Sequence, residues 1–308
     1  MKARRLYFLF AILMVAAFLI TSCSQETDSQ GPRKGEKLKI YTTIYPLYDF
    51  AAKIAGEKGL VEKVVPAGVE VHDFEPSPKL VAGIYDADVF VYLGGSIDPW
   101  AEKMAGQLSK EGVTVVKAGE SLFVEEPDEE GSDDHSDSHV WLDPVLAKAM
   151  AGRIAEALAE KDEENASYYR ENLKKLENRL DDLDQEYSKA LLQAPKKDFI
   201  VNHAAFGYLA KRYNLNQIAI SGLSSQQEPS PRKLAELSEL CREKGIKYIM
   251  VEASSSSKLA NVLAREVGAK VLILHPLENL SEEDMRAGKD YFALMMENLE
   301  NLKKALNE

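Results

Sequence analysis

Cysteine is almost absent from this chain, since only Cys23 and Cys241 occur among its 308 residues. A small fold held together by a framework of disulfides is therefore excluded. Cys241 shares a three- and four-residue spacing with Leu234, Leu237 and Leu240, which predicts the apolar face of a helix. We interpret Cys241 as a buried apolar side chain rather than as a reactive thiol.

Positive charge is also scarce. The chain has 38 lysine and arginine residues against 50 aspartate and glutamate residues, for a net charge of −12. Lys2, Arg4 and Arg5 carry three of the positive charges, so the chain without its first 22 residues has a net charge of −15. Nucleic-acid binding needs a basic surface, and we therefore expect no nucleic acid among the partners.

Only one long apolar run is present, Leu6–Ile20, and it is too short for a comfortable transmembrane helix of about 20 residues. It follows basic residues and precedes small ones, as in a secretory signal. The sequence I-T-S-C that ends at Cys23 resembles the lipobox of bacterial lipoproteins. We predict a lipoprotein signal peptide at residues 1–22, a lipid on Cys23, and a flexible polar tether at residues 23–37. The protein is then expected to be extracytoplasmic and lipid-anchored to the cell membrane; an ordinary cleaved signal with an incidental cysteine is the alternative.

Short runs rich in valine and isoleucine alternate with helical patterns along the rest of the chain. They predict eight strands, four in each half: Leu38–Ile44, Leu60–Pro66, Asp88–Leu93, Val113–Lys117, Asp198–Asn202, Leu215–Ile220, Ile246–Glu252 and Ala269–Leu274. This alternation is typical of parallel sheets with helices on both faces. We predict an α/β fold of two lobes, residues 38–163 and 194–308, each a four-stranded parallel sheet with flanking helices.

Two serine–proline pairs mark expected helix starts. Ser77-Pro78 and Ser230-Pro231 both belong to the repeated sequence E-P-S-P, at 75–78 and 228–231. Serine is a favoured N-cap, and proline fits the first helical position. The repeat also indicates that the two lobes arose by duplication.

Between the lobes, residues 164–193 are highly charged and contain no glycine or proline. Large apolar residues recur there at three- and four-residue spacing: Tyr169, Leu173, Leu176, Leu180, Leu183 and Tyr187. The spacing predicts one long amphipathic helix that joins the lobes. A coiled coil is the alternative, but the stripe spans few heptads.

Histidine is rare as well, with five in the chain, and three of the five lie in short polar and aromatic sequences: V-H-D-F-E-P, S-H-V-W-L-D-P and V-N-H-A-A-F-G-Y. His72 follows the second strand, His203 follows the Asp198–Asn202 strand, and His139 precedes a helix. Glu278 follows the last strand. Ligands of parallel sheets bind beyond the carboxyl ends of the strands, so these four side chains, two from each lobe, are expected to meet in a cleft. Three neutral imidazoles and one carboxylate suit Zn²⁺ better than a hard cation.

Several neighbours have two possible roles. Asp73, Glu75 and Asp143 are candidates for fixing imidazole tautomers, or they cap helices. Trp100 and Trp141 either wall the cleft or belong to the core. We interpret the acidic segment Glu125–Asp137, which includes His135, as a solvated loop with a modest attraction for cations.

At these motifs the chain resembles the zinc-binding solute-binding lipoproteins of ABC transporters, the cluster A-I metal-binding family. The matching sequences are H-D-F-E-P-S-P at 72–78, H-V-W-L-D-P at 139–144, N-H-A-A-F-G-Y-L at 202–209, and G-A-K-V-L with P-L-E-N-L between 268 and 280. The resemblance implies a long backbone helix, one metal between two lobes, and His72, His139, His203 and Glu278 as its ligands. His203 stands where the manganese branch typically has glutamate, which favours zinc. His275 is a departure from the family, whose members usually carry Asn or Asp there, and it is the alternative fourth ligand.

The expected function is an extracytoplasmic receptor that captures one Zn²⁺ per chain and delivers it to the permease of an ABC importer. The protein is expected to act as a monomer and not as an enzyme. The alternatives are a manganese or iron receptor of the same family, a zinc-dependent hydrolase, which needs an open metal position, and a surface adhesin.

Overall fold

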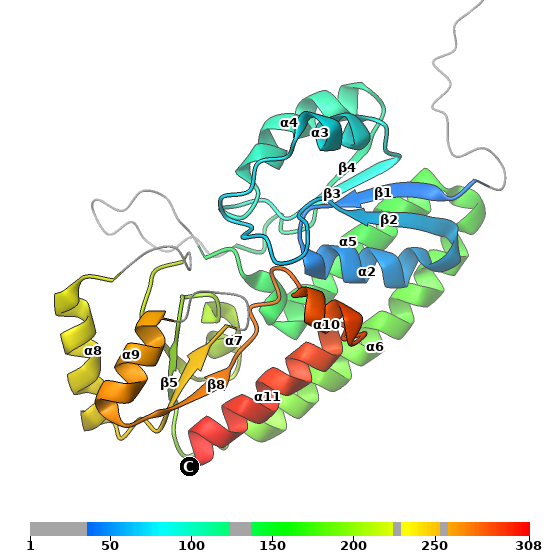
Figure 1. Ribbon diagram of the computed structural model, residues 1–308. Coiled ribbons are helices and arrows are strands. Elements are labelled where there is room, and N and C mark those ends of the chain that lie inside the picture. The colour runs from blue at the N-terminus through cyan, green and yellow to red at the C-terminus, as the bar shows by residue number, and fades with distance from the viewer. Residues whose placement is uncertain (1–35, 124–136, 224–228, 253–257) are drawn as a thin grey trace, which may run out of the picture. The chain divides into compact units, whose positions relative to one another are not determined.

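The computed structural model of the chain describes residues 36–123, 137–223, 229–252 and 258–308 (Figure 1). The expected signal peptide, Cys23 and most of the acidic segment, including His135, lie outside the described residues. Within the described ranges, no helix combines the length and the apolar character that a membrane span requires.

The first sheet has the strand order β2-β1-β3-β4, and all its strands are parallel. Its strands are β1 (Leu38–Thr42), β2 (Gly59–Lys63), β3 (Val89–Tyr92) and β4 (Thr114–Lys117). The accompanying helices are α2 (Tyr45–Ala55), α3 (Pro78–Tyr85), α4 (Pro99–Lys110) and α5 (Pro144–Lys161), with short 3-10 helices at Gly56–Lys58, Val140–Leu142 and Glu163–Asn165.

Alternating residues of these strands point to opposite faces of the sheet, as the period of a strand dictates. Val89 and Val91 pack with the core that contains α2 and α5. Phe90 and Tyr92 pack with α3 and α4 on the other face. The first lobe is therefore a sheet buried on both sides.

The second sheet repeats this order as β6-β5-β7-β8, again entirely parallel. Its strands are β5 (Asp198–Val201), β6 (Asn216–Ala219), β7 (Tyr248–Val251) and β8 (Lys270–Ile273). Its helices are α7 (Gly207–Arg212), α8 (Pro231–Glu243), α9 (Lys258–Val267), α10 (Glu282–Arg286) and α11 (Tyr291–Asn307). Cys241 is buried between the sheet and α8 and α9, as its apolar spacing predicts.

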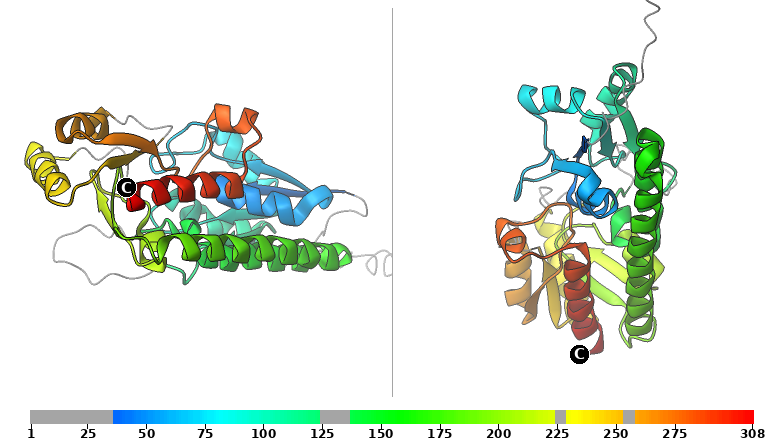
Figure 2. Two further views of the ribbon diagram at one scale, coloured as in Figure 1. Left: turned by 90° about the horizontal axis from the view of Figure 1, so that it is seen from below. Right: turned by 90° about the vertical axis from the view of Figure 1, so that its right-hand side faces the viewer.

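The long helix is α6 (Ala166–Leu191), with 26 residues. Its buried face carries most of the predicted apolar stripe, namely Tyr169, Leu176, Leu180, Leu183 and Tyr187, together with Leu191. Helix α11 lies alongside it in all views, and the Tyr187 hydroxyl donates to the carbonyl of Met295 (Figures 1 and 2). At about 1.5 Å per residue α6 is about 39 Å long. This length allows it to pack against elements of both halves of the chain.

The predicted fold class is confirmed: the chain forms two four-stranded parallel sheets with flanking helices and one long helix. Ser77 and Ser230 are N-caps, as predicted, and accept hydrogen bonds from Leu80 N at 3.4 Å and Lys233 N at 3.2 Å. Lys117 ends β4 as predicted, but the other seven predicted strand ends are wrong by one to three residues, because the chain leaves the sheet earlier than the apolar run ends. Val64 and Val65, for example, are buried beyond the end of β2.

Candidate metal centre

The four expected ligands come from four separate segments, and the fold brings them together. His72 lies in the irregular loop between β2 and α3, His203 is the second residue after the end of β5, and Glu278 lies in the loop after β8. His139 stands just before the 3-10 helix that leads into α5. Three of the four therefore lie beyond the carboxyl ends of parallel strands, where ligands of such sheets bind.

One ligand atom from each of His72, His139, His203 and Glu278 lies within 4.8 Å of all the others. Glu278 Oε1 is at the centre, 3.0 Å from His139 Nε2, 3.1 Å from His203 Nε2 and 3.7 Å from His72 Nε2. His139, His203 and Glu278 are buried, and the His72 side chain is 9% exposed.

The carboxylates and the imidazoles of this cluster shift one another's pKa values. Burial acts to lower the pKa of His203, but its hydrogen bonds to Glu252 and Glu278 outweigh burial and raise that pKa to about 10. The pKa of His139 is raised in the same way, against burial, by Asp137 and Glu278. Burial acts to raise the pKa of Glu278, yet the surrounding imidazoles hold it well below its usual range. Without a cation, protons on the imidazoles thus neutralise the buried carboxylate.

Two further carboxylates are hydrogen-bonded to the Nδ1 atoms of two of the rings. Asp137 Oδ1 lies 2.8 Å from His139 Nδ1, and Glu252 is hydrogen-bonded to His203 Nδ1. A carboxylate that accepts from Nδ1 leaves Nε2 free of its proton in the neutral ring and turned toward a metal. Once a ring has released its second proton, this arrangement would leave it in the tautomer that ligation requires.

The sequence indicates other residues for this supporting role. Asp143 instead caps α5, accepting from Val145 N at 2.9 Å, and pairs with Arg212. Within the described part of the chain, neither Asp73 nor Glu75 is hydrogen-bonded to a ring of the cluster. Glu252 could have been found, because it ends the predicted Ile246–Glu252 strand at the same edge as His203.

The two tryptophans have different environments. The ring of Trp141 packs against His139 at 5.1 Å between centroids, and its Nε1 donates to the carbonyl of Pro276 at 2.7 Å. Trp100 packs with Phe74 and Phe90 in the core of the first lobe. Trp141 is therefore a wall of the site, and Trp100 is a core residue.

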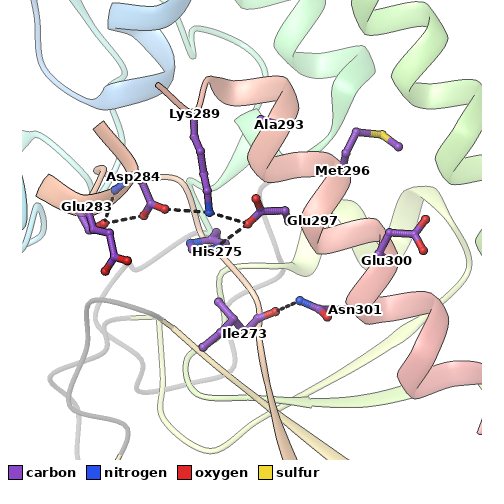
Figure 3. Close-up of a pocket in the computed structure, with 11 residues that line it drawn as sticks. Ile273, His275, Glu283, Asp284, Lys289, Ala293, Met296, Glu297, Glu300 and Asn301 are labelled. Atoms are coloured by element: carbon purple, nitrogen blue, oxygen red, sulfur yellow. Dashed lines mark hydrogen bonds and ion pairs between the residues drawn. The ribbon is translucent and has the colours of Figure 1, made fainter. Parts of the chain in front are cut away.

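His275 lies outside the cluster. It lines a separate pocket with Lys289 and Glu297, and its Nε2 is 3.8 Å from Glu297 Oε2 (Figure 3). Lys289 bridges Glu297 and Asp284 in the same pocket. Burial lowers the pKa of His275, so its ring is uncharged at neutral pH. The ring faces Glu297 and not the four-residue cluster.

The donor set fits a tetrahedral cation. Three imidazole nitrogens and one carboxylate are ligands of the kind that zinc takes in proteins. His72 Nε2 is buried and has no hydrogen-bond partner among the described residues. Leaving a buried polar atom unpaired costs about 1–3 kcal/mol, and a cation bound at the centre of the cluster would satisfy it.

Comparison with known proteins links the chain to zinc-binding proteins. The family model described as "Zinc-uptake complex component A periplasmic", ZnuA, matches residues 40–305. The high-affinity zinc uptake system protein ZnuA of Bacillus subtilis (strain 168) is 40% identical over 306 residues, which is 96% of each chain. The zinc-binding lipoprotein AdcA of Streptococcus pneumoniae (strain ATCC BAA-255 / R6) is 40% identical over 304 residues, 96% of this chain. The present chain spans only 60% of the length of that AdcA.

Solved structures show the same fold. The Zn(II)-bound ZnuA-like domain of Streptococcus pneumoniae AdcA is 41% identical with a TM-score of 0.78, over 88% of this chain and 100% of that domain. The laminin-binding protein Lmb of Streptococcus agalactiae, described as bifunctional with adhesin and metal-transporting activity, is 34% identical with a TM-score of 0.79, over 87% and 99% of the two chains. The match to the family model over most of the chain and the 40% identity to the Bacillus subtilis ZnuA over 96% of both chains lead to one conclusion: this chain belongs to the ZnuA family of zinc-uptake components.

Proposed function

We propose that this protein is an extracytoplasmic receptor that binds one Zn²⁺ between its two lobes. The observation that carries the proposal is the convergence of three Nε2 atoms on one buried carboxylate, with all four ligand atoms within 4.8 Å of one another. His72, His139, His203 and Glu278 are the proposed ligands. The names of the family and of its zinc-binding members support zinc as the cargo.

Delivery of the zinc to the membrane permease of an ABC importer is the second part of the proposal. The zinc-uptake description of the family supports it. A monomer with one site suffices for this role, because the four proposed ligands all come from one chain.

The ends of the proposed domains follow the sequence pattern. We propose a signal peptide at residues 1–22, a tether at 23–37, and lobes at 38–163 and 194–308, which the helix of residues 164–193 joins. The lipoprotein name of the AdcA relative supports a lipid on Cys23.

Replacing Cys23 with alanine should release the protein from the membrane, because the acylated side chain is then lost. The measurement is fractionation of cells that express the wild-type or the Cys23→Ala protein, with labelled palmitate to report acylation. Cys241→Ala is the matched control. Because Cys241 is buried and should carry no label, this variant should stay in the membrane and be labelled like the wild type. Equal amounts of the Cys23→Ala variant and the wild type in the membrane pellet would contradict the proposed lipid anchor.

Two alternatives differ from the zinc receptor in their chemistry. A catalytic zinc keeps one position open for water, whereas four protein donors crowd this site, which favours binding over hydrolysis. A manganese receptor would favour more oxygen donors, and three imidazoles favour zinc instead.

The test is a metal titration. Metal-free protein should bind one Zn²⁺ per chain and prefer it to Mn²⁺ in a competition series, since the affinity of nitrogen-rich sites follows the order Mn²⁺ below Zn²⁺. A preference for Mn²⁺, or a second site of equal affinity, would contradict the proposal.

A further inference from the structure

The chain after β8 crosses to the loop that carries His72 and is hydrogen-bonded to it. Gly68 N donates to the carbonyl of Leu280 at 3.1 Å, and Tyr45 N, at the start of α2, donates to the carbonyl of Glu278 at 3.0 Å. Leu277, the preceding residue, has a φ of 57°, an uncommon value for a residue with a side chain. The backbone around Glu278 is therefore held by the first lobe, although it follows a strand of the second.

The side chain of Asn279 also joins the segment of Glu278 to the segment that leads to His72. Its Nδ2 donates to the carbonyls of Pro66 and Val69, the latter at 3.0 Å, and its Oδ1 accepts from Lys63 Nζ and from Leu280 N. The partners fix the orientation of the amide, because an ammonium group can only donate and a carbonyl can only accept. Both amide hydrogens and the amide oxygen are thus used.

This connection matters for His72 in particular. The rings of His139 and His203 are held by Asp137 and Glu252, whereas the ion pair that the described residues show for the ring of His72 is with Glu278 itself, at 3.7 Å. His72 also lies in a loop without helix or strand, three residues after Val69. The position of its ring therefore depends on how that loop is held.

We propose that Asn279 is a positioning residue for metal binding, which holds the loop of His72 in register with Glu278. The inference rests on the proposed function. Asn279 touches no metal itself; it fixes the distance between two ligands that come from different halves of the chain.

The experiment compares the zinc affinities of wild type, Asn279→Ala and Asn279→Asp, measured by competition with a chelator. Asn279→Ala should weaken zinc binding by about 10- to 100-fold, the usual effect of removing a residue that orients a ligand. Asn279→Asp has the same shape and keeps the oxygen that faces Lys63, but it sets a carboxylate oxygen against the two carbonyls, so we expect a loss at least as large.

The matched control is Asn172→Ala, because Asn172 also donates its amide to a carbonyl, that of Ile54 at 3.1 Å, in a region outside the site. It should leave zinc affinity unchanged. Urea unfolding of the metal-free proteins separates a loss of affinity from a loss of stability.

A second arm tests whether Asn279 acts through His72. In a His72→Ala background the Asn279→Ala change should cost little further affinity, because the ligand that it positions is gone. Wild-type affinity in both Asn279 variants, or an equal loss with and without His72, would overturn the inference. Failure of the wild type itself to bind zinc would instead contradict the proposed function.

Discussion

Glu278→Gln should weaken zinc binding by more than about 100-fold, beyond the effect usual for residues that only orient a ligand. Glutamine has the shape of glutamate but no charge, and Glu278 supplies the only carboxylate among the four proposed ligands. Zn²⁺ bound by three imidazoles and a carboxylate has a net charge of +1, whereas without the carboxylate it keeps +2 in a buried site, which is more costly. Zinc titration by chelator competition measures the difference.

The matched control is His275→Asn, three residues away on the same segment. His275 faces Glu297 rather than the cluster, so its loss should change zinc affinity by about threefold or less, the scale of substitutions outside a site. A larger loss in His275→Asn than in Glu278→Gln would assign the fourth ligand to His275.

The separation of His275 from Glu278 illustrates a limit of prediction from sequence. Both follow the last strand closely enough to reach a metal, so spacing alone leaves either as the fourth ligand. The backbone between them decides, because Leu277 adopts a left-handed conformation that turns the chain. Leucine gives no sequence signal for such a turn, whereas glycine or asparagine would.

The strands and the gathering of the four candidate ligands were easier to predict. Runs of valine and isoleucine marked the strands, and the rule that parallel strands present their carboxyl ends at one edge located His72, His203 and Glu278. That rule depends only on topology, which the alternation of strands and helices reveals.

Side-chain partnerships between loops could not be predicted in the same way. Asp137 holds His139 from two residues earlier in the same segment, and Asn279 reaches a turn more than 200 residues earlier in the chain, whereas Glu252 could be found from the end of its predicted strand. Such contacts depend on side-chain rotamers and on the relative positions of loops, and the spacing of residues in the sequence predicts neither.

The metal-free protein should lose stability as pH rises from about 6.5 toward 10. His203 has a pKa of about 10 in the folded protein against an ordinary value of 6.5. A raised pKa stabilises the fold fully below the ordinary value, and this contribution is lost as pH rises through the folded value. The depressed pKa of Glu278 acts oppositely: its contribution is present above its ordinary value of 4.5 and is lost as pH falls through the folded value. Urea unfolding in the presence of a chelator, at about pH 6.5 and pH 9, should show the loss, and Glu278→Gln should reduce it.

Zinc affinity should change in the opposite direction over the same range. The imidazoles of His139 and His203 hold protons in the metal-free cluster, because Glu278, Asp137 and Glu252 raise their pKa values. Zinc binds only the unprotonated nitrogen, so binding releases protons, and affinity should rise about tenfold per pH unit for each proton released. Calorimetry in buffers of different ionisation enthalpy measures the number of protons directly. An affinity that is independent of pH between about pH 6 and pH 8, without proton release, would contradict histidine ligation, whereas release that falls in His203→Ala would place one of the protons on that ring.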